Sequence, residues 1–125
     1  VYEALVGDAE LPVLQTTVDR LHLVPAGRHL AGAEIELVTL DERDRRLRRL
    51  LDAVRDQYDF IFIDTPPSLG LLTLNALVAA DTVLIPLHCE YFALEALSDP
   101  LPTLSPIRQS LNPSLDVEFE VLPMF

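Results

Sequence analysis

The chain has 125 residues, 50% of them hydrophobic, which suits one modest core and is too little for two ordinary domains. Its formal net charge is −11 at pH 7, and all nine basic residues are arginines, so there is no lysine. This acidic balance argues against autonomous DNA binding, because the phosphate backbone attracts basic surfaces. The single cysteine, Cys89, excludes an internal disulfide, and no apolar run approaches the roughly 20 residues that span a bilayer. We therefore expect a cytoplasmic protein that does not enter a membrane.

The N-terminal part predicts short elements. Residues 2–7 form a short apolar pattern that a glycine would end as a helix stop, and residues 11–17 read as a connection. Residues 21–24 predict a short buried strand. His22 and His29 lie near it, but no second Cys/His pair stands at zinc-ligand spacing. We interpret both as surface or strand-end histidines.

A helix is predicted to begin near Thr39, because Thr39 and Glu42 form a capping box. Apolar residues then recur on one face at helical spacing: Leu47, Leu50, Leu51 and Val54. On the other face, acidic residues precede arginines by four positions: Asp41–Arg45, Glu42–Arg46 and Asp44–Arg48. Because these arginines have acidic partners, the arginine run indicates a solvated structural face and not a nucleic-acid site.

The most informative stretch is YDFIFIDTPPSLGLLT, residues 58–73. Its apolar run, residues 60–63, predicts a strand buried on both faces of a parallel sheet. Asp64 ends this run, where open α/β sheets place their ligands, and Thr65 and Pro66 begin a sharp turn. From this pattern alone, Asp64 is either a ligand-binding carboxylate or an ordinary turn residue.

A second helix and a second strand follow Gly70. The helix has an apolar stripe of Leu74, Leu77 and Val78. Ser68 is available as its N-cap. Residues 82–87 predict a buried strand, and Pro86 would mark its exit, because proline is poorly tolerated inside a central ladder.

Neither of two candidate nucleophiles fits a known catalytic arrangement. His88 and Cys89 are adjacent on a predicted strand end, so their side chains would point to opposite faces. Ser68 lacks the flanking glycines of a G-x-S-x-G elbow. We therefore predict no catalytic residue among them.

The C-terminal third predicts one short helix and one strand. Residues 90–98 have helical spacing, which three prolines then interrupt: Pro100, Pro102 and Pro106. A short final helix would start at Ser105–Pro106 and end before Asn112. Apolar residues at 117, 119 and 121 alternate with acidic ones, as in an edge strand with one solvated face.

These patterns predict four parallel strands, near residues 21–24, 60–63, 82–87 and 117–122, with helices between them. The expected fold class is α/β, with a mostly parallel sheet that is flanked by helices.

The ParA family of deviant P-loop ATPases, which segregate bacterial chromosomes and plasmids, has a Walker B region similar to YDFIFIDTPPSLGLLTLNALVAADTVLIPLHCEYFALEAL. That family's preceding segment is similar to LVPAGRHLAGAEIEL. The resemblance covers residues 21–112 and includes specific positions: Asp64, Pro66-Pro67, Ser68-Leu69-Gly70, Asn75, Ala79-Ala80-Asp81, Pro86 and Glu90-Tyr91. It implies that the chain is the central part of a P-loop NTPase domain of the ParA/MinD type.

The resemblance also implies a cofactor site. Asp64 would be the Walker B carboxylate that holds the shell of a Mg²⁺ ion beside ATP, and Thr65 and Pro66 would shape the loop next to it. It further implies an ATP-dependent homodimer, a ParB-like partner, and nonspecific DNA bound through parts outside these residues. The location would be the bacterial cytoplasm, at the nucleoid.

A phosphate-binding loop needs clustered glycines and a lysine, and this chain has four scattered glycines and no lysine. We therefore expect residues 1–125 to be a partial domain, truncated at both ends and inactive alone. The chain also departs from the family at Ala96, where ParA-like proteins have glycine, and at the prolines, where they continue one longer helix. Two alternatives remain: a MinD-like membrane-cycling ATPase, or a decayed, nucleotide-independent α/β interaction module.

Overall fold

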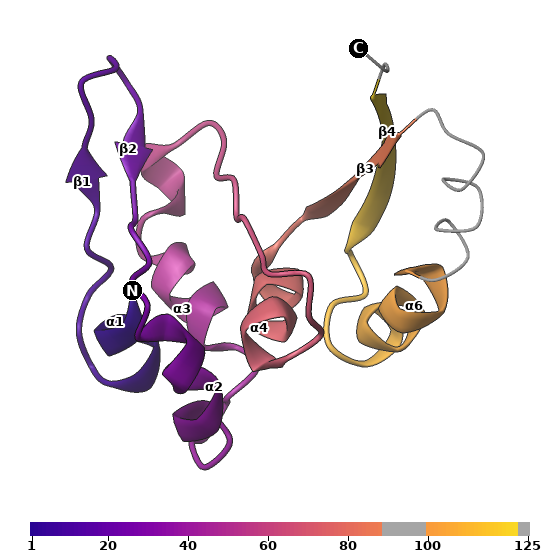
Figure 1. The fold of residues 1–125 in the computed structure, drawn as a ribbon, viewed down its shortest axis with the longest axis horizontal. Helices are drawn as coiled ribbons and strands as arrows, with labels where there is room; N and C mark the ends of the chain where they lie inside the picture. Colours follow the sequence, from indigo (N-terminus) through magenta and orange to yellow (C-terminus); the bar gives the residue numbers. More distant parts are fainter. Residues whose placement is uncertain (89–99, 123–125) are drawn as a thin grey trace. The chain divides into compact units, whose positions relative to one another are not determined.

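The computed structural model describes residues 1–88 and 100–122, and the chain divides into two compact units, Val1–Ala79 and Ala80–Phe125 (Figure 1). The helical spacing predicted at residues 90–98 lies outside the described residues, as do Cys89, Glu90, Tyr91 and Ala96. Among the residues described, no helix is both long enough and apolar enough to cross a membrane.

The first unit is mainly helical. Its helices are α1 (Tyr2–Val6), α2 (Leu30–Leu37), α3 (Arg46–Asp52), the 3-10 helix η1 (Arg55–Gln57) and α4 (Leu71–Ala79). Helix α2 packs against α1 and α4, and α3 also packs against α4. These contacts bury a small apolar core: Ala4, Leu5, Ala33, Leu37, Ala76, Leu77 and Val78. Helix α4 confirms the helix predicted after Gly70, and α1 ends just before Gly7, as expected.

The predicted capping box at Thr39 is wrong. The Thr39 hydroxyl donates to the carbonyl of Glu36 at 3.1 Å, so it serves the end of α2, a helix that the sequence patterns did not single out. Residues 38–45 form turns, Glu42 has a φ of 51°, and α3 begins only at Arg46. The predicted apolar stripe of α3 is half-buried.

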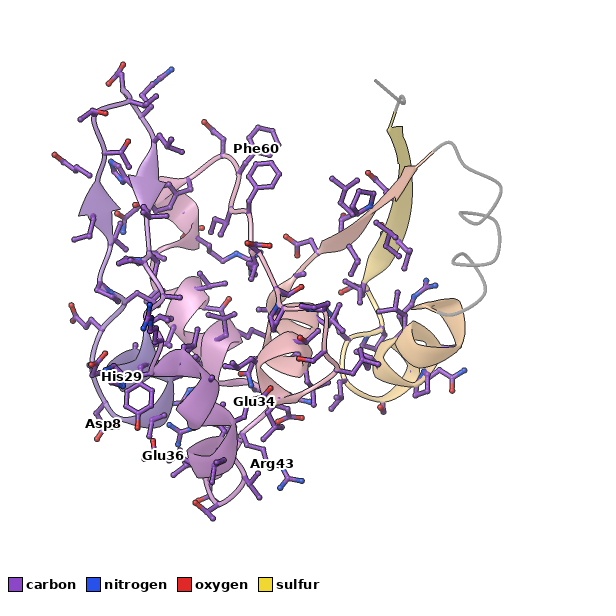
Figure 2. All side chains as sticks on the ribbon, in the orientation of Figure 1. Asp8, His29, Glu34, Glu36, Arg43 and Phe60 are labelled. Carbon is purple, nitrogen blue, oxygen red and sulfur yellow. The ribbon has the colours of Figure 1, made fainter. Side chains whose placement is uncertain are left out.

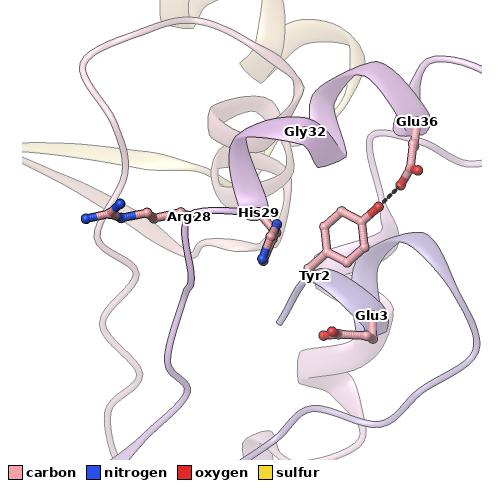
Figure 3. A pocket seen from close by; sticks show the side chains of 6 residues that line it. All are labelled: Tyr2, Glu3, Arg28, His29, Gly32 and Glu36. Atoms are coloured by element: carbon pink, nitrogen blue, oxygen red, sulfur yellow. Dashed lines mark hydrogen bonds between the residues drawn. The ribbon is translucent and has the colours of Figure 1, made fainter.

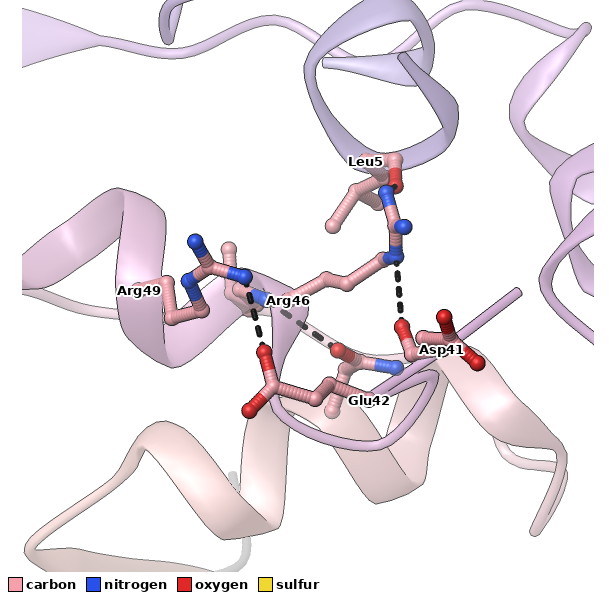
Figure 4. Close-up of polar contacts among 7 residues, drawn as sticks. Leu5, Asp41, Glu42, Arg46 and Arg49 are labelled. Carbon is pink, nitrogen blue, oxygen red and sulfur yellow. Dashed lines mark hydrogen bonds and ion pairs between the residues drawn. The ribbon is translucent and has the colours of Figure 1, made fainter. Parts of the chain in front are cut away.

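The arginines of α3 also pair differently from the prediction. Glu42 forms an ion pair with Arg49 at 2.7 Å, and Asp52 pairs with Arg55, so none of the three predicted pairs forms in the described residues. Arg46 instead donates to the Leu5 carbonyl at 3.0 Å and to the Asp41 carbonyl at 3.3 Å, which ties α3 to α1 (Figure 4).

Two of the four predicted strands are wrong. The strand expected at residues 21–24 is reduced to β2 (His22–Leu23), which pairs antiparallel with β1 (Leu14–Gln15) in an exposed hairpin. Residues 60–63 form no strand, and Phe60 and Phe62 are 81% and 88% exposed. Phe60 lies on the extended segment between η1 and α4 (Figure 2). A strand forms when its backbone groups pair with a neighbouring strand, and no described segment of this chain pairs with residues 60–63.

The second unit contains the parallel pair that the sequence predicts. Strands β3 (Thr82–His88) and β4 (Asp116–Leu122) run in parallel, in register from Thr82 opposite Asp116 to His88 opposite Leu122. Pro86 does not mark the exit of β3, because it lies inside the strand, opposite Glu120. The strand tolerates it because β4 is its single neighbour among the described residues, so one edge of β3 needs no N–H donor.

Helix α6 (Pro100–Ser110) overturns the prediction that three prolines end the helical pattern. Pro100 and Pro102 lie in its first turn, where backbone N–H groups have no helical acceptor in any case. Pro106 lies inside the helix and does not start a new one at Ser105. The helix ends before Asn112, as predicted, and the buried Asn112 amide donates to the Ala80 carbonyl at 2.8 Å.

Candidate functional site

The predicted site residues Asp64, Thr65 and Pro66 lie together on the loop that joins the exposed apolar segment to α4. All three are exposed. The Asp64 carboxylate has no hydrogen bond or ion pair with any residue that the structure describes. An exposed carboxylate without a protein partner is available to a ligand, because forming such a contact breaks no existing one.

The C-terminal end of this loop is fastened to α4. The hydroxyl of the buried Thr73 donates to the Ser68 carbonyl at 2.6 Å, and the Leu74 N–H donates to the Gly70 carbonyl at 3.0 Å. Ser68 thus contributes its carbonyl, and its hydroxyl is not the predicted N-cap. The carboxylate at the start of α4 comes instead from Glu34 of α2, whose Oε1 accepts from the Leu72 N–H at 3.3 Å.

Asn75 holds α4 in place from its buried side. Only 1% of Asn75 is exposed, and its Oδ1 accepts from the Leu47 N–H at 3.1 Å. Its Nδ2 donates to the carbonyls of Arg43 and Leu71 at 2.7 and 2.8 Å. Because buried polar groups need partners, this amide fixes α4 against the start of α3 and the turn before it.

The N-terminal end of the apolar segment is also anchored. The Tyr58 hydroxyl and the His22 Nδ1 lie 2.7 Å apart, and the two rings meet edge to face with centroids 5.5 Å apart. His22 is exposed on β2, so this contact joins the hairpin to the segment that leads towards Asp64.

The site offers one ligand to a magnesium ion. Among the described residues, no three His, Cys, Asp or Glu side chains gather around a possible metal position. A single carboxylate fits Mg²⁺, which commonly takes one or two protein carboxylates and completes its octahedron with water and substrate phosphates. Water and substrate phosphates would supply other ligands of a magnesium ion held in this way.

A separate hollow of about 460 Å³ contains none of the predicted site residues (Figure 3). It is lined by Tyr2, Glu3, Arg28, His29, Gly32 and Glu36. The Tyr2 hydroxyl donates to the Glu36 carboxylate, and this hydrogen bond raises the pKa of Tyr2 above its usual value. The contact joins α1 to α2.

Three curated relatives are similar to nearly the whole chain. It is 52% identical to the sporulation initiation inhibitor protein Soj of Bacillus subtilis, over 99% of this chain and 50% of that protein. It is 53% identical to the chromosome partitioning protein ParA of Myxococcus xanthus, over 100% of this chain and 45% of that protein. It is 50% identical to the chromosome-partitioning ATPase Soj of Treponema pallidum, over 94% of this chain and 47% of that protein. The chain thus spans about half the length of these relatives.

A solved structure confirms the α/β fold class. Cobyrinic acid a,c-diamide synthase from Mycobacterium smegmatis, with bound ATP analogue and magnesium, has a TM-score of 0.86 and 40% identity. The match covers 98% of this chain and 50% of that one. A family model described as an AAA domain also matches residues 1–117. The chain therefore belongs to the ParA/Soj family of AAA-domain proteins.

Proposed function

We propose that the complete protein is a ParA-like ATPase that binds and hydrolyses ATP with Mg²⁺ to drive chromosome or plasmid partitioning. The observation that carries this proposal is the Asp64 carboxylate, exposed and without a partner among the described residues, at the end of the apolar segment. Family membership supports it, as do the names of the relatives and the ATP analogue and magnesium bound to the similar solved structure.

In this proposal Asp64 is the Walker B carboxylate, and it holds Mg²⁺ through an oxygen or through a water in the metal's shell. A Mg²⁺ ion bound with ATP neutralises charge on the β and γ phosphate oxygens. Thr65 and Pro66 shape the nucleotide-facing loop, and Thr73 and Asn75 keep that loop and α4 in place. The phosphate-binding loop would come from residues outside this chain.

The partners follow from the same proposal. The complete protein would form a homodimer when ATP is bound, respond to a ParB-like partner and contact nonspecific DNA through residues outside this chain. It would act in the bacterial cytoplasm, at the nucleoid. The alternative of a decayed module loses one of its supports, because α6 accommodates the three prolines at which the chain departs from the family.

Metal removal tests this function. We expect the complete protein to hydrolyse ATP in the presence of Mg²⁺, with a Michaelis constant of about 1 μM to 1 mM. EDTA should stop hydrolysis and added Mg²⁺ should restore it. Residues 1–125 alone should give no binding heat in calorimetry with Mg²⁺-ATP, because scattered glycines and absent lysines cannot cradle phosphates. Hydrolysis that persists in EDTA, or micromolar ATP binding by residues 1–125 alone, would contradict the proposal.

A further inference from the structure

The N-terminal end of α4 is occupied by a carboxylate from a different helix. Glu34, half-buried on α2, accepts a hydrogen bond from the Leu72 N–H with its Oε1, at 3.3 Å. The first N–H groups of a helix have no acceptor inside the helix, and the helix dipole favours negative charge there. The Glu34 carboxylate therefore stabilises the first turn of α4.

Gly70 provides the room for this carboxylate. A Cβ at position 70 would lie 1.9 Å from the Glu34 Oε1 and 2.6 Å from its Cδ. The backbone does not itself require glycine, because no glycine in the described part of the chain has a positive φ. An alanine at position 70 would therefore leave the backbone unstrained and displace the Glu34 side chain.

The loop that carries Asp64 depends on this end of α4. The polar contacts of residues 64–70 within the described chain are the two already given, Ser68 to Thr73 and Gly70 to Leu74, and both lead into α4. Pro66 and Pro67 have fixed φ angles, so the backbone between Asp64 and α4 has few angles free to rotate. A shift of the helix end should therefore also move Asp64.

We propose that Glu34 is a positioning residue for the Asp64 carboxylate: it fixes the first turn of α4, in the space that Gly70 leaves, and thereby holds the Asp64 loop for the metal. This inference rests on the proposed function of Asp64. Glu34 itself would not touch the metal or the nucleotide.

A double-mutant cycle in the nucleotide-free complete protein tests the structural half of the proposal. Glu34→Ala and Gly70→Ala should each lower the thermal midpoint by about 2–4 °C, the shift expected for loss of one capping interaction in a protein of 150–250 residues. The double variant should be no less stable than Glu34→Ala alone, because the alanine at position 70 then has nothing to displace. Additive losses, or a Gly70→Ala midpoint equal to that of the wild type, would overturn the coupling.

The magnesium dependence of turnover tests the functional half. Glu34→Ala should raise the Mg²⁺ concentration for half-maximal turnover by about tenfold, because loss of a residue that supports a metal ligand weakens metal binding. Glu34→Gln should keep this Mg²⁺ concentration close to that of the wild type, because its amide oxygen can accept from the Leu72 N–H in the same way. Glu36→Ala is the matched control on the same helix: it loses the Tyr2 contact and some stability but should keep the wild-type magnesium dependence.

Failure of this inference can be told apart from failure of the proposed function. If Asp64→Ala abolishes turnover while Glu34→Ala keeps the wild-type magnesium dependence, the role of Glu34 is overturned and that of Asp64 stands. If Asp64→Ala hydrolyses ATP normally, both are overturned, whatever the thermal cycle shows.

Discussion

At the scale of single residues, the side chain of Asn75 links three backbone segments of the first unit. Its amide accepts one hydrogen bond from the Leu47 N–H and donates two, to the carbonyls of Arg43 and Leu71. Two of these partners lie 28 and 32 positions away in the sequence. Asn75 therefore fixes tertiary structure and not only the local helix.

Replacement of Asn75 should destabilise the protein strongly. We expect Asn75→Ala to lower the free energy of unfolding by about 2–4 kcal/mol, since it leaves buried polar groups without partners and opens a cavity. Asn75→Asp has nearly the same shape but should cost at least as much at pH 7, because a carboxylate would face the carbonyls of Arg43 and Leu71. The denaturant midpoints of the complete protein measure both effects. Wild-type midpoints for both variants would show that the amide contacts contribute little.

The residues of the candidate site were predictable to different degrees. Asp64, Thr65 and Pro66 are consecutive, so the apolar run and the prolines around them are enough to mark a loop at those positions. The contact of Glu34 with the Leu72 N–H spans 38 positions, and no periodic pattern announces it. A contact that depends on tertiary packing cannot be predicted from sequence spacing, so the role of Glu34 was not predicted.

At the scale of elements, local sequence patterns predicted the helices and strands whose own residues carry the pattern. Strands β3 and β4 and helix α4 follow from runs and stripes of apolar residues within their own bounds. The capping box failed because the Thr39 hydroxyl pairs with the preceding helix. The prolines of α6 were wrongly predicted to interrupt the helix, because two of them lie in its first turn, where proline is tolerated.

The strand predicted at residues 60–63 did not depend on local pattern alone, because a buried strand exists only when other segments cover it. In residues 1–125 alone, Phe60 and Phe62 are almost fully exposed, and no described strand pairs with them. An exposed apolar segment with free backbone groups favours association between chains.

We therefore predict that residues 1–125 alone associate despite their net charge of −11. Replacing Phe60 and Phe62 together by threonine should reduce the mass measured by light scattering, because it removes the largest exposed apolar side chains of the segment. Ile35→Thr is the matched control: Ile35 is 78% exposed, but it stands on α2, away from the segment in sequence, and should leave the mass unchanged. A stable monomer of residues 1–125 at micromolar concentration would contradict this account.

At the scale of the whole molecule, the chain spans about half the length of the ParA and Soj relatives that it matches. In the proposed function, Asp64 is the contribution of these residues to a site for ATP and magnesium. The net charge of −11 argues against DNA contacts on residues 1–125 themselves, because an acidic surface repels the phosphate backbone.

The central claim is that Asp64 is the metal-binding carboxylate of an ATPase, and turnover at saturating Mg²⁺-ATP tests it most directly. Asp59→Ala is the matched control, since Asp59 is also an exposed carboxylate without a described partner, five positions earlier in the sequence. Asp64→Ala should lower the turnover of the complete protein by about 100-fold or more, because a lost metal ligand costs several kcal/mol of transition-state stabilisation. Asp59→Ala should stay within about twofold of the wild type, and both variants should unfold near the wild-type temperature, as exposed substitutions usually do. Wild-type turnover by Asp64→Ala would contradict the claim and leave Asp64 as a turn residue.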